Sequence, residues 1–225
     1  KNKHINDIMN YMLIIRGEWM KSYNTIENEE TSELVEKKSK FIANIIHINK
    51  PEEAEAKLGE IRKKYYDARH NCYAYRVLDC DNNIIDRSSD DGEPSGTAGA
   101  PMLNILKMEE LCNILVVVTR YFGGILLGTG GLVRAYSQAT QDVIQKSKIV
   151  LKQEGYEATI EIEYKDFEKL KYFCKVNEIN IKEVEYLENI MAKLEMKKES
   201  QVLFMQKENL NFDYLNYKVI QEKFI

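Results

Sequence analysis

The residues most able to do chemistry lie in a glycine-rich turn. An apolar run at residues 114–118 leads into this turn at residues 119–131, and a predicted helix follows. Glycine lets backbone N–H groups approach a phosphate, and the first N–H groups of a helix are unpaired and carry partial positive charge. Arg120 enters the turn and Arg134 lies in the first turn of the helix, so two guanidinium groups are available for phosphate contacts. The pattern favours an anion site, and the alternative is that the glycines only permit tight turns and close helix–sheet packing.

The turn departs from the known nucleotide-binding motifs. A P-loop needs Lys after Gly128, where Thr129 stands, and a dinucleotide fingerprint needs Gly where Val133 stands. These departures argue against nucleotide hydrolysis and NAD binding, and no cofactor is expected. The candidate binding residues of the turn are Arg120, Tyr121, Phe122, Gly123, Gly124, Gly128, Gly130, Gly131 and Arg134.

An acidic loop and a histidine form the second group of candidates. Asp90, Asp91 and Glu93 could bind a hard cation, cap the next helix or pair with the arginines. The alternating ligands and closing Glu of an EF-hand are missing, so no metal site is predicted. His70 and Asn71 precede a strand, where the histidine could be structural, ligand-binding or catalytic. No G-x-S-x-G nucleophile motif accompanies them.

Basic and aromatic residues alternate in the first half of the chain. Lysines and arginines cluster at residues 37–40 and 62–69, with Tyr73, Tyr121 and other aromatic residues between them. Such a mixture can hold a sugar–phosphate backbone and stack bases. The net charge is −4, so anion binding must come from a local patch, and an ordinary mixed surface is the alternative.

The pattern of apolar residues predicts the elements that position these groups. Strand material is predicted at 25–48, 72–78, 84–88 and 114–118, and helices at 52–66, 102–109 and 132–148. Composition changes near residues 149–155, since no glycine follows Gly155 and no arginine follows Arg134. Beyond this point the predicted order is strand 156–164, helix 166–178, strand 179–187, strand 190–196, helix 199–210 and strand 217–224. That βαββαβ order is the ferredoxin-like split motif.

The sequence therefore predicts an α+β protein with two domains, at residues 20–148 and 156–225. Residues 1–19 are interpreted as an extension outside the fold, and their apolar patch is too short to span a membrane. None of the four cysteines forms a C-x-x-C pair, so zinc-ribbon and thioredoxin spacing is missing, and reduced thiols in a cytoplasmic protein are expected. No membrane partner is expected.

Three long stretches resemble one known family. Residues 68–76 (ARHNCYAYR), 89–99 (SDDGEPSGTAG) and 117–136, with VVTRYFGG and GTGGLVRAY, resemble the motifs of the YigZ/IMPACT family. The resemblance runs from about Met20 to Ile225. One departure is Leu126, where the family pattern usually has Lys, and this loss weakens the case for an anion-binding loop.

The resemblance implies a fold and a range of functions. It implies a first domain that is a β/α sandwich like domain two of a small-subunit ribosomal protein. The second domain would be like a ferredoxin-like domain of elongation factor G. Eukaryotic members regulate translation by binding an activator of a starvation-responsive translation kinase.

Three functional hypotheses follow. The first is a non-catalytic protein that binds RNA, the ribosome or a translation-apparatus protein, with Tyr73, Tyr121 and Phe122 stacking on bases. The second is a hydrolase acting on a phosphorylated or carboxylated ligand through His70 and the acidic loop. The third is a protein–protein regulator that uses the same face.

Overall fold

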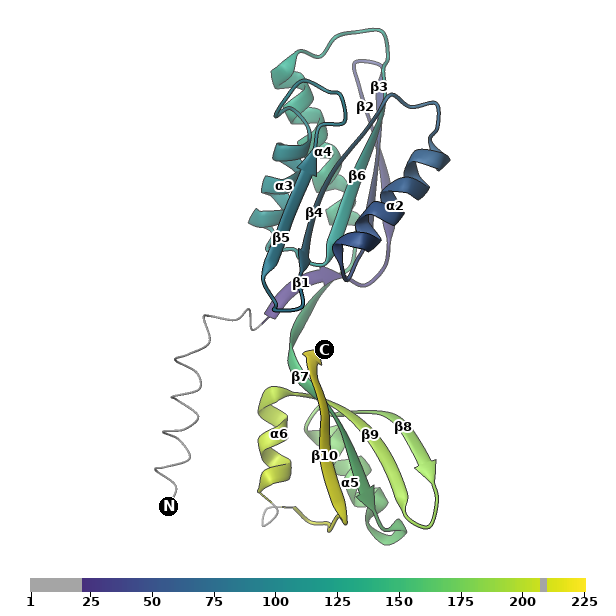
Figure 1. The fold of residues 1–225 in the computed structure, drawn as a ribbon, viewed down its shortest axis with the longest axis vertical. Helices are drawn as coiled ribbons and strands as arrows, with labels where there is room; N and C mark the ends of the chain where they lie inside the picture. The colour runs from purple at the N-terminus through teal and green to yellow at the C-terminus, as the bar shows by residue number, and fades with distance from the viewer. Residues whose placement is uncertain (1–21, 207–209) are drawn as a thin grey trace, which may run out of the picture. The chain divides into compact units, whose positions relative to one another are not determined.

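The computed structural model describes residues 22–206 and 210–225, which form two compact units that divide after Leu151 (Figure 1). Each unit is built on an antiparallel sheet with helices packed against it, so the protein is α+β with two sheets. The predicted extension at residues 1–19 lies outside the described residues. The predicted domain limits of 20–148 and 156–225 remain predictions.

The first unit contains a five-stranded sheet and one further strand, β1, that lies outside this sheet. The sheet order is β2-β3-β6-β4-β5, with β6 in the centre. Strand β6 is buried along nearly its whole length because helices cover both faces of the sheet, which explains its unbroken apolar run. The elements are β1 (Ser22–Ile26), β2 (Glu30–Glu36), β3 (Ser39–His47), α2 (Pro51–Lys64), β4 (His70–Leu78), β5 (Ile84–Ser89), α3 (Gly99–Met108), β6 (Ile114–Tyr121) and α4 (Thr129–Lys146).

Alternating side chains divide between the two faces of this sheet. Helices α3 and α4 cover one face and α2 covers the other (Figure 1). In β4, Cys72 and Ala74 pack with α3 and α4, whereas Tyr75 and Val77 pack with α2. Apolar side chains two residues apart on a strand therefore share a face, and the two faces of the sheet carry two separate apolar cores.

The strand register gathers the candidate residues at one end of the sheet. Lys40 in β3 pairs with Tyr121, and His70 in β4 pairs with Arg120. The β2–β3 turn at residues 37–38 and the loops at 90–98 and 122–128 therefore leave the sheet at the same end. We call this the loop end.

The second unit has the predicted βαββαβ order. Its elements are β7 (Ile149–Ile162), α5 (Tyr164–Val176), β8 (Asn180–Tyr186), β9 (Ile190–Lys197), α6 (Lys198–Met205) and β10 (Asn216–Phe224). In its sheet, β7 pairs with β10 and with β9, and β9 pairs with β8. The first strand begins at Ile149 rather than at the predicted Tyr156, because the start of β7 also pairs with β1. Within residues 22–206 and 210–225, no helix is both long enough and apolar enough to cross a membrane.

Candidate functional site

Arg120 is buried in an ion pair. Its Nη1 lies 2.6 Å from Glu93 Oε1, and the two side chains are only 7% and 4% exposed. The guanidinium also lies over the rings of Phe41 and Phe122, 5.5 Å from each centroid. Arg120 therefore ties the acidic loop to the sheet and cannot reach a ligand while this pair is intact. This corrects the predicted role of Arg120 as a phosphate contact.

The Glu93 carboxylate is held from a second direction. Tyr136 in α4 donates its hydroxyl to Glu93 Oε1 at 2.9 Å, and the Cys72 thiol donates to Tyr136 Oη at 3.3 Å. Burial raises the pKa of Cys72 to about 12 and moves the pKa of Tyr136 well above its usual range. Both groups stay protonated at neutral pH, so Cys72 is a packing and donor group and is not a reactive thiolate.

Asp90 organises the start of α3. Its carboxylate accepts the N–H groups of Gly96 at 2.8 Å and of Ala98 and Gly99 at 2.9 Å. Burial by itself would raise the pKa of Asp90, but these three N–H donors hold it below its usual range. Of the three predicted roles for this carboxylate, the structure shows capping.

The other side of the acidic loop is held by hydrogen bonds that involve Asp91, His70 and Asn71. Asp91 accepts the N–H of Asn71 at 2.7 Å and Arg62 Nη2 at 2.9 Å. His70 Nδ1 lies 2.9 Å from the carbonyl oxygen of Asp91, which requires a proton on Nδ1. Asn71 Oδ1 accepts the hydroxyl proton of Thr119 at 2.8 Å. Across the described part of the chain, no group of three His, Cys, Asp or Glu residues is placed to hold a metal ion.

The aromatic candidates do not share one surface. Tyr73 packs against the core under α2 and stacks on Tyr75. Tyr121 donates its hydroxyl to Asp67 at 2.7 Å, a bond that raises the pKa of Tyr121 to about 12. Phe122 is 52% exposed and covers Arg120. Of the three predicted stacking residues, only Phe122 presents a largely exposed ring.

The glycine-rich turn lies tightly against the β2–β3 turn. A Cβ on Gly123 would lie 2.0 Å from the backbone of Lys38, so only glycine permits this approach. The Gly123 N–H donates to Ser39 Oγ at 3.2 Å. Gly128 is the N-cap of α4 and has a φ of 72°, which favours glycine. Gly124 also has a positive φ, Gly131 packs on Leu127, and Gly130 lies beside Arg134. Close packing and positive φ angles thus account for most of these glycines. This is what we expect if the glycines only permit tight turns and close helix–sheet packing.

The start of α4 leaves hydrogen-bond donors open. The Leu132 N–H is bonded to Gly128 O, and no side chain among the described residues caps the preceding amides of residues 129–131. Arg134 and Lys37 line a pocket of about 220 Å³ beside them, together with Leu34, Glu36, Leu127, Gly131, Ala135 and Gln138. Neither Arg134 nor Lys37 forms an ion pair within residues 22–206 and 210–225. We call the amides of residues 129–131, Arg134 and Lys37 the donor surface.

Lys37 was absent from the candidate site residues predicted from the sequence. Its basic cluster was visible, but its neighbour Arg134 is far away in the chain. The packing of α4 on β2 and the contact of Gly123 with the β2–β3 turn bring the two segments together.

Comparison with known proteins agrees with the motifs. Residues 37–144 match the Impact N-terminal domain, and residues 160–207 match a domain of unknown function, DUF1949. The IMPACT family member YvyE of Bacillus subtilis is 37% identical over 75% of this chain and 77% of its own length. The IMPACT family member YigZ of Escherichia coli is 42% identical over 57% of this chain and 63% of its own. The crystal structure of a hypothetical protein is 30% identical, with a TM-score of 0.58, over 91% of this chain and 100% of that one. The predicted family is confirmed, and this chain belongs to the IMPACT family.

Proposed function

We propose that this protein is a non-catalytic binding protein that associates with RNA of the translation apparatus through the donor surface. Membership of the IMPACT family supports a role in translation, since the resemblance includes eukaryotic members that regulate it. The observation that carries the proposal is the start of α4, where the amides of residues 129–131 lie beside Arg134 and Lys37, and the part of the chain that the structure describes offers neither a capping side chain nor an ion-pair partner. A phosphate group is the natural acceptor for such donors.

Local charge favours this end of the sheet although the whole chain is slightly acidic. Nearby carboxylates are consumed internally, since Asp90, Asp91 and Glu93 each accept donors from the chain. Arg134 and Lys37 therefore face few competing carboxylates, and Glu36 is the acidic residue that shares their pocket. Binding through so few contacts would be weak and strongly dependent on salt.

Fold analogy gives the proposal further support. The β/α sandwich of the first unit would correspond to domain two of a small-subunit ribosomal protein. The βαββαβ unit would correspond to the ferredoxin-like domain of elongation factor G. Both relatives act on RNA or the ribosome. A shared fold by itself does not establish a shared function, so the proposal depends mainly on the groups of the donor surface.

The test compares Arg134→Ala with Lys50→Ala in the full chain. Lys50 is an exposed lysine that follows β3, at the opposite end of the sheet from the donor surface. We expect Arg134→Ala to weaken binding to single-stranded RNA and co-sedimentation with ribosomes at low salt, by about fivefold. Lys50→Ala should bind like the wild type. Wild-type protein with no affinity for RNA or ribosomes at low salt would overturn the proposal.

A protein partner is the second candidate, and one observation favours it. Phe122, Ile125 and Leu126 on the glycine-rich turn are 52%, 42% and 82% exposed. Adjacent exposed apolar side chains are a frequent mark of protein docking. Leu126→Asp would abolish capture of a protein partner. Recovery of one protein with no RNA, lost in that variant, would favour this candidate over the first.

The hydrolase alternative gains no support from the geometry. The three acidic side chains each hold backbone or side-chain donors of the chain itself, and His70 is bonded to the loop. A general base needs a substrate proton within reach, and these groups are already directed at internal partners.

A further inference from the structure

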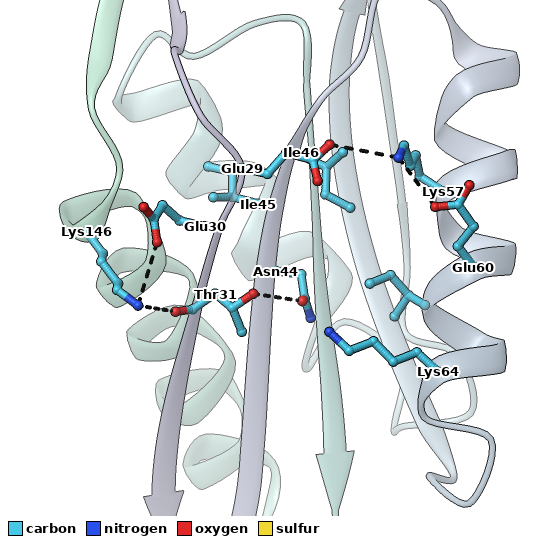
Figure 2. A pocket seen from close by; sticks show the side chains of 11 residues that line it. Glu29, Glu30, Thr31, Asn44, Ile45, Ile46, Lys57, Glu60, Lys64 and Lys146 are labelled. Carbon is cyan, nitrogen blue, oxygen red and sulfur yellow. Dashed lines mark hydrogen bonds and ion pairs between the residues drawn. The ribbon is translucent and has the colours of Figure 1, made fainter.

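A second groove lies on the other face of the first unit. It has a volume of about 480 Å³ and is bordered by β2, β3 and α2, with Lys146 of α4 at its rim (Figure 2). Its lining residues are Glu29, Glu30, Thr31, Asn44, Ile45, Ile46, Lys57, Glu60, Ile61, Lys64 and Lys146. None of the residues of the donor surface borders it.

Asn44 is the unusual residue of this groove. It lies within a run of buried apolar residues in β3 and is only 4% exposed. Its Oδ1 accepts the hydroxyl proton of Thr31 at 3.1 Å, but its Nδ2 has no acceptor among residues 22–206 and 210–225. A buried amide donor without a partner is unfavourable, and native proteins rarely leave one. An apolar side chain at position 44 would pack without that penalty. A hydrogen-bond acceptor from outside the chain would explain why an amide stands here instead.

The charges around the groove leave one lysine without a carboxylate. Lys57 lies 3.9 Å from Glu29 and 3.3 Å from Glu60, and Lys146 lies 3.6 Å from Glu30. Lys64 makes no such pair within the described residues, and its ammonium instead lies 5.1 Å from the ring centroid of Tyr65.

The two open donors belong to one part of the groove. Figure 2 shows the Lys64 ammonium on the same side of the groove as the Asn44 amide nitrogen, with no acceptor drawn between them. Lys64 is exposed on a flexible side chain, so it can move to admit a ligand.

We propose that this groove binds a small oxyanion, a carboxylate or phosphate group, that accepts from Asn44 Nδ2 and pairs with Lys64. The oxygen atoms would satisfy the buried amide and neutralise the one unpaired lysine. The surrounding carboxylates, already paired with Lys57 and Lys146, would exclude large polyanions and favour a small ligand. This inference is independent of RNA binding at the donor surface.

The experiment titrates the full chain with inorganic phosphate and, separately, with acetate, at constant ionic strength. Calorimetry would measure affinity, and the side-chain amide signal of Asn44 would be followed by NMR. We expect saturable binding of at least one anion and a shift of the Asn44 amide protons, and comparing the two anions identifies the preferred group. Lys64→Ala should weaken binding at least about tenfold, the loss of one charge-assisted contact.

Three further variants keep the test specific. Lys63→Ala removes a neighbouring lysine that does not line the groove and should bind like the wild type. Asn44→Asp supplies a carboxylate to Lys64 and should abolish anion binding. Arg134→Ala should leave the shift of the Asn44 amide signal unchanged, even though it removes any phosphate contact at the donor surface, and this separates the two sites. The proposal is overturned if neither anion binds saturably, if Lys64→Ala binds as tightly as Lys63→Ala, or if the Asn44 amide signal does not move.

Discussion

The acidic loop at residues 90–98 and the part of the glycine-rich turn that follows β6, residues 122–131, lie at the same end of one sheet, yet they use their polar groups in opposite ways. In the acidic loop, each carboxylate accepts donors supplied by the chain. In the glycine-rich turn and the start of α4, uncapped amides and Arg134 find no carboxylate in the described residues. The comparison teaches that residue type shows which chemistry is possible, whereas partnering shows whether the fold has already used it.

The largest expected effect is that of Arg120→Ala, which removes the buried ion pair of the acidic loop. It leaves Glu93 buried with the Tyr136 hydroxyl as its remaining side-chain donor. Removing one partner of a buried ion pair lowers the free energy of unfolding by about 3–5 kcal/mol. Urea denaturation would measure the change. Arg134→Ala, the matched control, should change stability by less than about 0.5 kcal/mol because Arg134 is exposed. A stable Arg120→Ala variant that has lost RNA binding would reverse the roles of the two arginines.

Asp90→Ala should have the next largest effect. It removes three N–H···carboxylate bonds at the start of α3 and should lower the free energy of unfolding by about 2 kcal/mol. Thermal or urea unfolding of the full chain would check this value. An unchanged unfolding midpoint would mean that the acidic loop does not depend on this cap.

The same carboxylate predicts a pH dependence. The pKa of Asp90 is lower in the folded protein than its usual value, so the folded state binds fewer protons than the unfolded chain as pH falls through this range. Its contribution to stability is therefore present above about pH 4 and is lost as pH falls through the folded pKa. Asp90→Asn should flatten the stability profile below about pH 4 relative to the wild type. Identical acid profiles for the two proteins would contradict this assignment.

On the donor side, Lys37→Ala should reduce RNA affinity modestly. Loss of one exposed cation from the donor surface should weaken binding by about threefold at low salt and reduce the salt dependence by somewhat less than one unit in slope. Fluorescence anisotropy across a salt series would measure both values. An unchanged slope would place Lys37 outside the RNA contact.

The smallest expected effect is a gain in RNA affinity from Leu126→Lys. The family pattern usually has Lys at this position, and Leu126 is 82% exposed on the glycine-rich turn. Adding a cation next to the donor surface should tighten RNA binding by about twofold at low salt. The same anisotropy titration would detect it. Weaker binding by this variant would favour an apolar protein contact at the turn.

Much of the fold was predictable because its signals are local. The βαββαβ order follows from apolar periodicity within single elements. Most predicted helices and strands differ from the observed ones at their ends, but the strand stretch predicted at 25–48 is divided among β1, β2 and β3. The start of β7 was missed because its first residues pair with β1, a distant segment whose contribution no local pattern shows.

The site was less predictable because it depends on partners far apart in the chain. Arg120 in β6 and Glu93 in the acidic loop are separated by 27 positions, and Tyr136 joins them from α4. The acidic loop combines two of the roles expected from the sequence, capping by Asp90 and ion pairing by Asp91 and Glu93, and the sequence alone does not say which residue takes which role. The packing of α4 on β2, which places Lys37 and Arg134 beside the same pocket, is likewise a property of the tertiary structure.

The most direct test of the contrast between the two loops is an amide NMR titration of the full chain with a short single-stranded RNA. The backbone amides of residues 129–131 should shift with saturation, while those of Gly96, Ala98 and Gly99, already bonded to Asp90, should stay in place. Shifts confined to the Asp90-bonded amides, or no shift at the start of α4, would contradict the account.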